Sequence, residues 1–146
     1  MRFVLPDDKQ AVFQMHIQIR WGDMDAMGHV NNAVYFRYME SLRIEWFRRL
    51  GCLAGPDGQG PVIINAFCTF MRQLEYPGDV LATHYVGPAS AMGRSTLDTY
   101  ATLARADHPD RIDAEGGATV VWTDFKAQKS LAMPEAMRRR MLQPLG

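Results

Sequence analysis

The segment from Arg20 to Asn32, RWGDMDAMGHVNN, concentrates side chains that could carry out acid–base or nucleophilic chemistry. Its polar members are two carboxylates, a histidine and two asparagines, at Asp23, Asp25, His29, Asn31 and Asn32. A carboxylate can serve as a nucleophile or as a general base, and imidazole and amide groups can orient a substrate or a water. The same residue types are common in turns and helix caps, so their spacing alone leaves both interpretations open.

The elements on either side of this segment must position it. Alternating apolar residues predict a strand over Val12–Arg20, which a turn at Gly22 ends. Apolar residues three or four apart then predict a long helix over Asn32–Leu50, with Asn31 as its N-cap and Gly51 after its last residue. The apolar face of this helix is predicted to contain Tyr35, Phe36, Met39, Leu42, Trp46, Phe47 and Leu50.

The start of this helix is where the segment could act on a carbonyl. The first backbone N–H groups of a helix have no partner within the helix, and they lie at the positive end of its dipole. Such donors bind an oxyanion or polarise a carbonyl oxygen. Together with a neighbouring carboxylate, they indicate acyl-transfer chemistry between Asp23 and Asn32.

The remainder of the chain is predicted to form four more strands and a short helix. The strands are predicted over Val62–Leu74, Val80–Pro88, Arg94–Ala104 and Gly117–Phe125, and the helix over Pro134–Met141. Loops or turns are predicted at Ala54–Pro61, Tyr76–Asp79, Ala91–Gly93 and Asp107–Glu115. A lone strand, a long helix and four consecutive strands indicate one α+β domain over residues 1–146, with a curved antiparallel sheet around the helix.

Composition narrows the class of protein. The 146 residues include 16 basic and 16 acidic side chains, so no overall charge attracts nucleic acid or an anionic membrane. No run approaches the ~20 apolar residues of a membrane span, and the first residues lack a secretory pattern. We therefore expect a soluble, cytoplasmic protein with no nucleic-acid or membrane partner.

The cysteines and histidines do not form the pattern of a disulfide scaffold or of a metal site. Cys52 and Cys68 leave one disulfide open. The histidines lack ligand spacing, so no metal is expected. His16 and His84, both in predicted strands, are expected to face solvent or a polar neighbour.

The run from Arg20 to Gly51 resembles the signature of the hotdog-fold acyl-CoA thioesterases, in the 4-hydroxybenzoyl-CoA thioesterase-like family. The matching residues are Arg20–Asp25, Gly28–Asn32, Tyr35, Glu40, Arg43 and Leu50–Gly51. A weaker likeness extends over nearly the whole chain, at Tyr76–Asp79, Arg94–Ser95, Gly117–Val121 and Asp124–Pro134.

This resemblance implies a hotdog fold, in which a five-stranded antiparallel sheet wraps around the long central helix. It implies a homodimer or homotetramer with active sites between two chains. Asp25 is then the catalytic carboxylate, as nucleophile or general base in thioester hydrolysis, while the Asn32 backbone N–H polarises the carbonyl and His29 orients the thioester or a water. The substrate-binding positions carried over are Asp23, which is also expected to shape the turn, Asn31, Tyr35, Arg94 and Ser95.

The resemblance also implies an acyl-CoA substrate. No cofactor is expected, because CoA is a part of the substrate and then a product. Its phosphates require basic side chains, for which the candidates are Arg94, Lys126, Lys129 and Arg138–Arg140. The acyl group is expected along the helix, near Tyr35, Phe36 and Met39.

Other functions fit parts of the sequence. An acyl carrier protein could present the acyl group in place of CoA, and the same fold can serve as a non-catalytic acyl-CoA-binding module. A hydratase or dehydratase of this fold uses Gly-Asp-x-Asn-Pro-x-His, which Gly22–His29 does not match. A second thioesterase class has its carboxylate on the helix after His-Gly-Gly. Here Val30-Asn31 replaces the glycines, and Glu40 can instead pair with Arg43.

Overall fold

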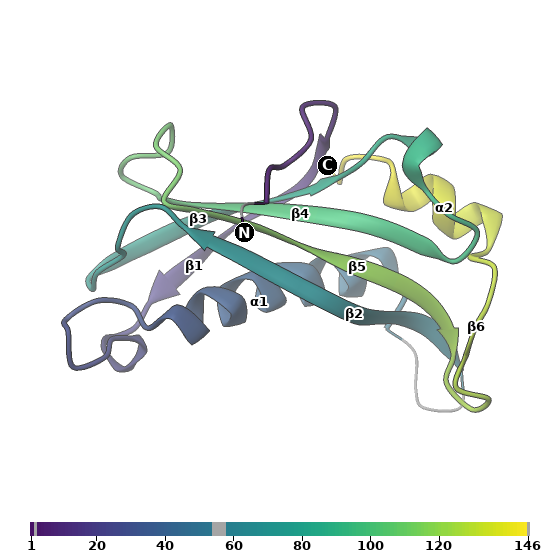
Figure 1. The fold of residues 1–146 in the computed structure, drawn as a ribbon, viewed down its shortest axis with the longest axis horizontal. Helices are drawn as coiled ribbons and strands as arrows, with labels where there is room; N and C mark the ends of the chain where they lie inside the picture. Colours follow the sequence, from purple (N-terminus) through teal and green to yellow (C-terminus); the bar gives the residue numbers. More distant parts are fainter. Residues whose placement is uncertain (2, 54–57, 146) are drawn as a thin grey trace.

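Helix α1 (Asn32–Leu50) lies against one face of a curled antiparallel sheet in the computed structural model of this chain (Figure 1). The structure describes residues 1, 3–53 and 58–145. In spatial order the long strands are β1 (Gln10–Ile19), β3 (Gly78–Val86), β4 (Thr96–Arg105), β5 (Ala114–Asp124) and β2 (Gln59–Phe70). This is the α+β hotdog arrangement that the sequence predicts.

Short elements complete the fold. Two 3₁₀ turns, η1 (Trp21–Asp23) and η2 (Ala89–Ala91), follow β1 and β3, and a two-residue strand β6 (Lys129–Ser130) pairs with β5. Helix α2 (Glu135–Met141) lies at the end of the sheet remote from the start of α1 (Figure 1). Within the described ranges, no helix has the length and apolar character needed to cross a membrane.

The long helix has the predicted bounds and caps. The Asn31 side chain accepts a hydrogen bond from the Ala33 N–H, and Gly51 ends the helix. Its predicted apolar face is buried except for Phe36, which is 39% exposed and lies edge-on to the Phe70 ring. The predicted pair of Glu40 with Arg43 is wrong, since Glu40 instead bonds to Arg37 at 2.6 Å.

Two predicted loops are shorter than expected. Part of the loop predicted over Ala54–Pro61 lies outside the described residues. The predicted end of this loop is wrong, since β2 already begins at Gln59. The predicted end of the Asp107–Glu115 loop is also wrong. Residue Ala114 already pairs with Phe70 and is fully buried, so that β5 begins there. Residues far apart in the sequence therefore set these strand ends.

Other parts of the strands and turns also differ from the prediction. Strand β2 ends at Phe70 rather than Leu74, because the Leu74 N–H bonds to the Tyr35 hydroxyl at 2.9 Å. Strand β4 begins at Thr96, which leaves Arg94 and Ser95 in the preceding connection. That connection contains η2 in place of the predicted tight turn at Ala91–Gly93.

The hydrophobic core lies between α1 and the face of the sheet that it covers. Leu42 and Trp46 are fully buried there. Burying a large apolar side chain stabilises the fold by about 1.5–3 kcal/mol. Gly116 lets α1 approach β5 closely, because a Cβ atom at this position would lie 2.8 Å from the Met39 sulfur.

The two cysteines are free thiols, so the disulfide left open by the sequence does not form. Cys52 is buried and Cys68 is partly buried. Burial raises the pKa of the Cys52 thiol to about 11 and that of Cys68 to about 12. Both thiols are therefore protonated and unreactive near neutral pH.

His84 corrects one of the expectations for the strand histidines. His16 is exposed, but His84 is only 2% exposed, because it shares the inner face of β3 with Ala82 and Val86. Its ring centroid lies 4.5 Å from that of Trp46. Neither ring nitrogen has a hydrogen-bond partner in the described part of the chain. Burial, reinforced by the charge of Arg43, lowers the pKa of His84 to about 3, so its imidazole is neutral.

We predict that His84 makes the fold sensitive to acid. Between pH 6.5 and about 3 an unfolded histidine binds a proton that the folded His84 does not, so stability falls as the pH falls. The slope from this group is at most about 1.4 kcal/mol per pH unit. Denaturant unfolding at pH 7 and pH 5 measures this loss, which His84→Leu should reduce. The control is His16→Leu, at an exposed position of β1, which should lose as much stability between pH 7 and pH 5 as wild type does. Equal pH slopes for wild type and His84→Leu would contradict the prediction.

Candidate active site

Asp23 fixes the turn between β1 and α1. Its Oδ2 accepts hydrogen bonds from the Arg20 N–H at 2.8 Å and from the Tyr38 hydroxyl at 2.7 Å. Burial raises the pKa of Tyr38, and the Asp23 carboxylate raises it further, so the phenol remains a donor. The Asn31 N–H also donates to the Asp23 carbonyl at 3.0 Å. Asp23 therefore anchors the whole segment to the helix.

Asp25 has a more open environment. Its Oδ1 accepts from the Met27 N–H at 2.9 Å, and its Oδ2 lies 3.4 Å from the Asn31 side-chain nitrogen. The Asp25 N–H donates to the His29 carbonyl at 2.9 Å, which closes a small loop. Gly28 turns this loop with a φ of 79°, a left-handed conformation that other residues adopt at a cost. The exposed carboxylate is held by its own loop.

The start of α1 presents a free donor beside this loop. Asn31 satisfies the next two N–H groups, since its side chain accepts from Ala33 at 2.9 Å and its carbonyl accepts from Val34 at 2.8 Å. Among the described residues, the Asn32 N–H has no acceptor. An unpaired N–H at the positive end of a helix can polarise a carbonyl oxygen.

A cavity of about 560 Å³ brings these groups together. Its walls come from the Asp25 loop, from the first turn of α1 and from the chain that follows β2. The lining residues are Asp25, Met27, His29, Val30, Asn32, Tyr35, Phe70, Met71, Arg72 and Gln73. Its volume is typical of a small-molecule site, and its walls combine polar and apolar side chains.

Tyr35 joins the two sides of this cavity. Its hydroxyl donates to the Arg72 carbonyl at 3.2 Å and accepts from the Leu74 N–H at 2.9 Å. The residue is 2% exposed, and burial raises the pKa of its phenol. The Val30 N–H also donates to the Leu74 carbonyl at 2.8 Å. The helix start and the β2–β3 connection are thereby locked together.

His29 lies on the same cavity wall as Asp25. Its Nε2 is 3.4 Å from Glu75 Oε1, and its side chain is 28% exposed. The carboxylate of Glu75 can orient the imidazole. An imidazole held in this way can hold a substrate oxygen or a water beside Asp25.

The structure separates the remaining predicted site residues. Asn31 supports Asp25 and caps the helix, whereas the Asp23 carboxylate is engaged by Arg20 and Tyr38. Arg94 and Ser95 precede β4, and the Arg94 carbonyl accepts from the Met133 N–H at 3.1 Å, close to α2. They do not line the Asp25 cavity of their own chain.

The residues that sequence reasoning missed lie at the end of β2 and directly after it, at Phe70–Gln73. They fall at the end of a predicted strand, where no local pattern points to a site. Their only signal is Arg72, a charge beside apolar residues.

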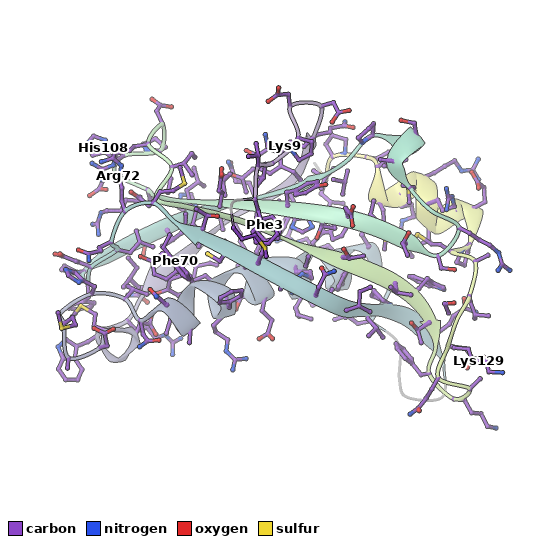
Figure 2. All side chains as sticks on the ribbon, in the orientation of Figure 1. Phe3, Lys9, Phe70, Arg72, His108 and Lys129 are labelled. Atoms are coloured by element: carbon purple, nitrogen blue, oxygen red, sulfur yellow. The ribbon has the colours of Figure 1, made fainter. Side chains whose placement is uncertain are left out.

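A second hollow, of about 390 Å³, lies beneath Phe3, which Figure 2 places over the middle of the sheet. Three of its polar residues, Asn65, Asp98 and Thr119, are already bonded to one another. The Thr119 hydroxyl donates to Asp98 at 2.8 Å, and the Thr119 N–H donates to the Asn65 side chain at 3.1 Å. The Asp25 cavity is therefore the better candidate for chemistry.

Solved structures of known proteins resemble this chain over most of its length. The PA2801 protein of Pseudomonas aeruginosa, a candidate thioesterase, has a TM-score of 0.83 and 34% identity, over 90% of this chain and 99% of its own. A candidate acyl-CoA thioesterase from Xanthomonas campestris has a TM-score of 0.73 and 28% identity, over 85% of this chain and 100% of its own. YsmA of Bacillus subtilis is 26% identical over 124 residues, which are 79% of this chain and 82% of YsmA.

A long helix wrapped by a curled antiparallel sheet defines the hotdog fold. Residues 19–141 match the model of the thioesterase-like superfamily. The chain belongs to this superfamily and is a thioester hydrolase.

We predict that Asn31→Ala weakens both the fold and the site. The substitution removes the helix cap at the Ala33 N–H, which costs about 1 kcal/mol, and it frees the Asp25 side chain. Denaturant unfolding measures the first effect. Asn32→Ala is the matched control, because it keeps the backbone N–H and removes no cap, so its stability should stay within about 0.5 kcal/mol of wild type. Equal stability of the two variants would contradict the assignment.

Proposed function

We propose that this enzyme hydrolyses an acyl-CoA thioester to a free carboxylic acid and CoA, with Asp25 as the catalytic carboxylate. One observation carries the proposal: a single cavity is lined by both Asp25, whose side chain is exposed, and Asn32, whose N–H has no acceptor among the described residues. Thioester hydrolysis needs these two groups, one to deliver the oxygen nucleophile and one to stabilise the developing oxyanion.

The Asn32 N–H donates to the thioester carbonyl oxygen while the nucleophile attacks the carbonyl carbon. Either Asp25 accepts a proton from the attacking water, or its carboxylate attacks first and water then hydrolyses the resulting anhydride. In both routes the C–S bond breaks and the CoA thiolate gains a proton. In the first route the acyl carbon takes the water oxygen directly. In the second route it first bonds to an Asp25 oxygen, and attack of water on the anhydride then releases the acid and restores the Asp25 carboxylate. His29, beside Glu75, orients the thioester or the water.

We predict that Asp25→Asn lowers kcat by at least a hundredfold, about 2.7 kcal/mol of transition-state stabilisation. The substitution preserves the shape of the side chain and removes its charge. The measurement is thiol release from a panel of acyl-CoA substrates. Glu40→Gln is the matched control, since Glu40 is an exposed helix carboxylate that bonds to Arg37, and it should keep wild-type activity. Survival of hydrolysis in Asp25→Asn with loss in Glu40→Gln would reverse the two assignments.

We further propose that two copies associate along β2, as a homodimer or as half of a homotetramer. Strand β2 is at one edge of the sheet, so one side of its backbone is free to pair. Exposed apolar side chains gather on it and beside it, at Phe36, Val62, Ile64, Phe70 and Met71. Antiparallel pairing of the β2 strands of two copies would cover these side chains and leave neither copy with an unpaired β2 edge.

The positions of the basic residues support a site shared between two chains. Lys126 and Lys129 follow β5 where it pairs with Gln59, at the opposite end of β2 from Phe70. The strand between has 12 residues, which at ~3.3 Å each span roughly 36 Å. This exceeds the length of a pantetheine arm. Antiparallel pairing would instead bring the lysines of the second copy beside the Asp25 cavity, where they could bind CoA phosphates.

We predict that Ile64→Lys separates the copies and abolishes hydrolysis. Ile64 is 61% exposed on β2, and two lysines brought together there would repel each other. Sedimentation velocity measures the assembly, and thiol release measures the activity. Gln18→Lys, at an exposed position on the opposite edge strand β1, should change neither. A full-sized oligomer in Ile64→Lys would place the interface elsewhere.

A further inference from the structure

We propose that Arg72 binds an anionic oxygen group of the substrate in the Asp25 cavity, an inference that rests on the thioesterase function proposed above. The substrate offers two sources of this chemistry. One is a carboxylate on the acyl group, and the other is a phosphate of CoA. The experiment below distinguishes them.

The backbone of Arg72 is held on both sides. Its N–H donates to the Asp113 carbonyl at 2.9 Å, and its carbonyl accepts from the Tyr35 hydroxyl at 3.2 Å. Asp113 is only 1% exposed, so this anchor lies inside the fold. Figure 2 places Arg72 at the end of the sheet where the chain leaves β2, with Phe70 nearer to α1. A fixed backbone gives the exposed side chain a fixed origin on the cavity wall.

The charge of Arg72 is uncommitted, in contrast to the neighbouring arginines. Arg105 bonds to the carbonyls of Glu75 and Pro77 and to Asp107. Arg111 lies 3.5 Å from Asp113. The guanidinium of Arg72 has no hydrogen-bond or ion-pair partner among the described residues, which are 1, 3–53 and 58–145. An arginine stays charged at any physiological pH, so this cation is always available.

The cavity wall makes this cation different from an ordinary surface arginine. Among the residues that line the cavity, Arg72 is the only permanently charged cation. Its neighbours on the wall include the apolar Met27, Phe70 and Met71, whose side chains are accessible to solvent, so an ion pair would form in an open site. The planar guanidinium matches a carboxylate or a phosphate with two parallel hydrogen bonds.

The test is calorimetric binding of thioether analogues that resist hydrolysis. The ligands are the butyryl and glutaryl analogues, each made on CoA and on pantetheine without phosphates. Arg72→Met should weaken binding about tenfold for the ligands that carry the recognised group and leave the others unchanged. Arg72→Lys keeps the positive charge but loses the two parallel donors of the guanidinium, so it should weaken the binding of these ligands less. Arg37→Met, which removes an exposed arginine outside the cavity, should bind like wild type.

The pattern of losses identifies the group. Losses confined to both CoA ligands identify a phosphate, and losses confined to both glutaryl ligands identify an acyl carboxylate. An equal change in all ligands, including butyryl-pantetheine, would overturn the proposal by assigning Arg72 a structural role, as would no change in any. Thiol release from the matching thioesters is measured in parallel. Absence of hydrolysis by wild type would refute the proposed reaction, while the binding pattern would still decide the role of Arg72.

Discussion

The hydroxyl of Tyr35 is the contact on which the rest of the site depends. It joins the first turn of α1 to the connection between β2 and β3, because it donates to the Arg72 carbonyl and accepts from the Leu74 N–H. A buried polar group deprived of its partner costs about 1–3 kcal/mol. Burying the Tyr35 ring therefore commits the connection to one position, and Asn32 and the residues after β2 line a single cavity.

Asp23 and Asp25, which are separated by a single residue, have different roles because their carboxylates make different hydrogen bonds. Asp23 uses one carboxylate oxygen to bind Arg20 and Tyr38, which attaches the loop to α1. Asp25 accepts one short bond from its own loop and one at 3.4 Å, and otherwise faces the cavity. A carboxylate must keep lone pairs free in order to react. Because Asp23 holds the loop in place, the Asp25 carboxylate is positioned while it makes few hydrogen bonds of its own.

Local signals in the sequence were sufficient for α1 and for the segment before it. The Asn31 cap, the apolar spacing and Gly51 act within a turn or two of chain, and the helix has the predicted bounds. The same locality explains the errors. His84 is buried because β3 lies under α1, and Ala114 belongs to a strand because it pairs with Phe70. Neither fact is encoded by the immediate neighbours of those residues.

The sequence by itself determined the α+β class, the long helix and a carboxylate, histidine and asparagine motif at the helix start. Only the tertiary structure decided which distant residues complete the cavity. Arg72 is some 40 positions from Asn32 along the chain, and no periodicity links them. They meet because the buried Tyr35 hydroxyl must bond to the β2–β3 connection, and a buried hydrogen bond constrains groups in space whatever their separation in sequence.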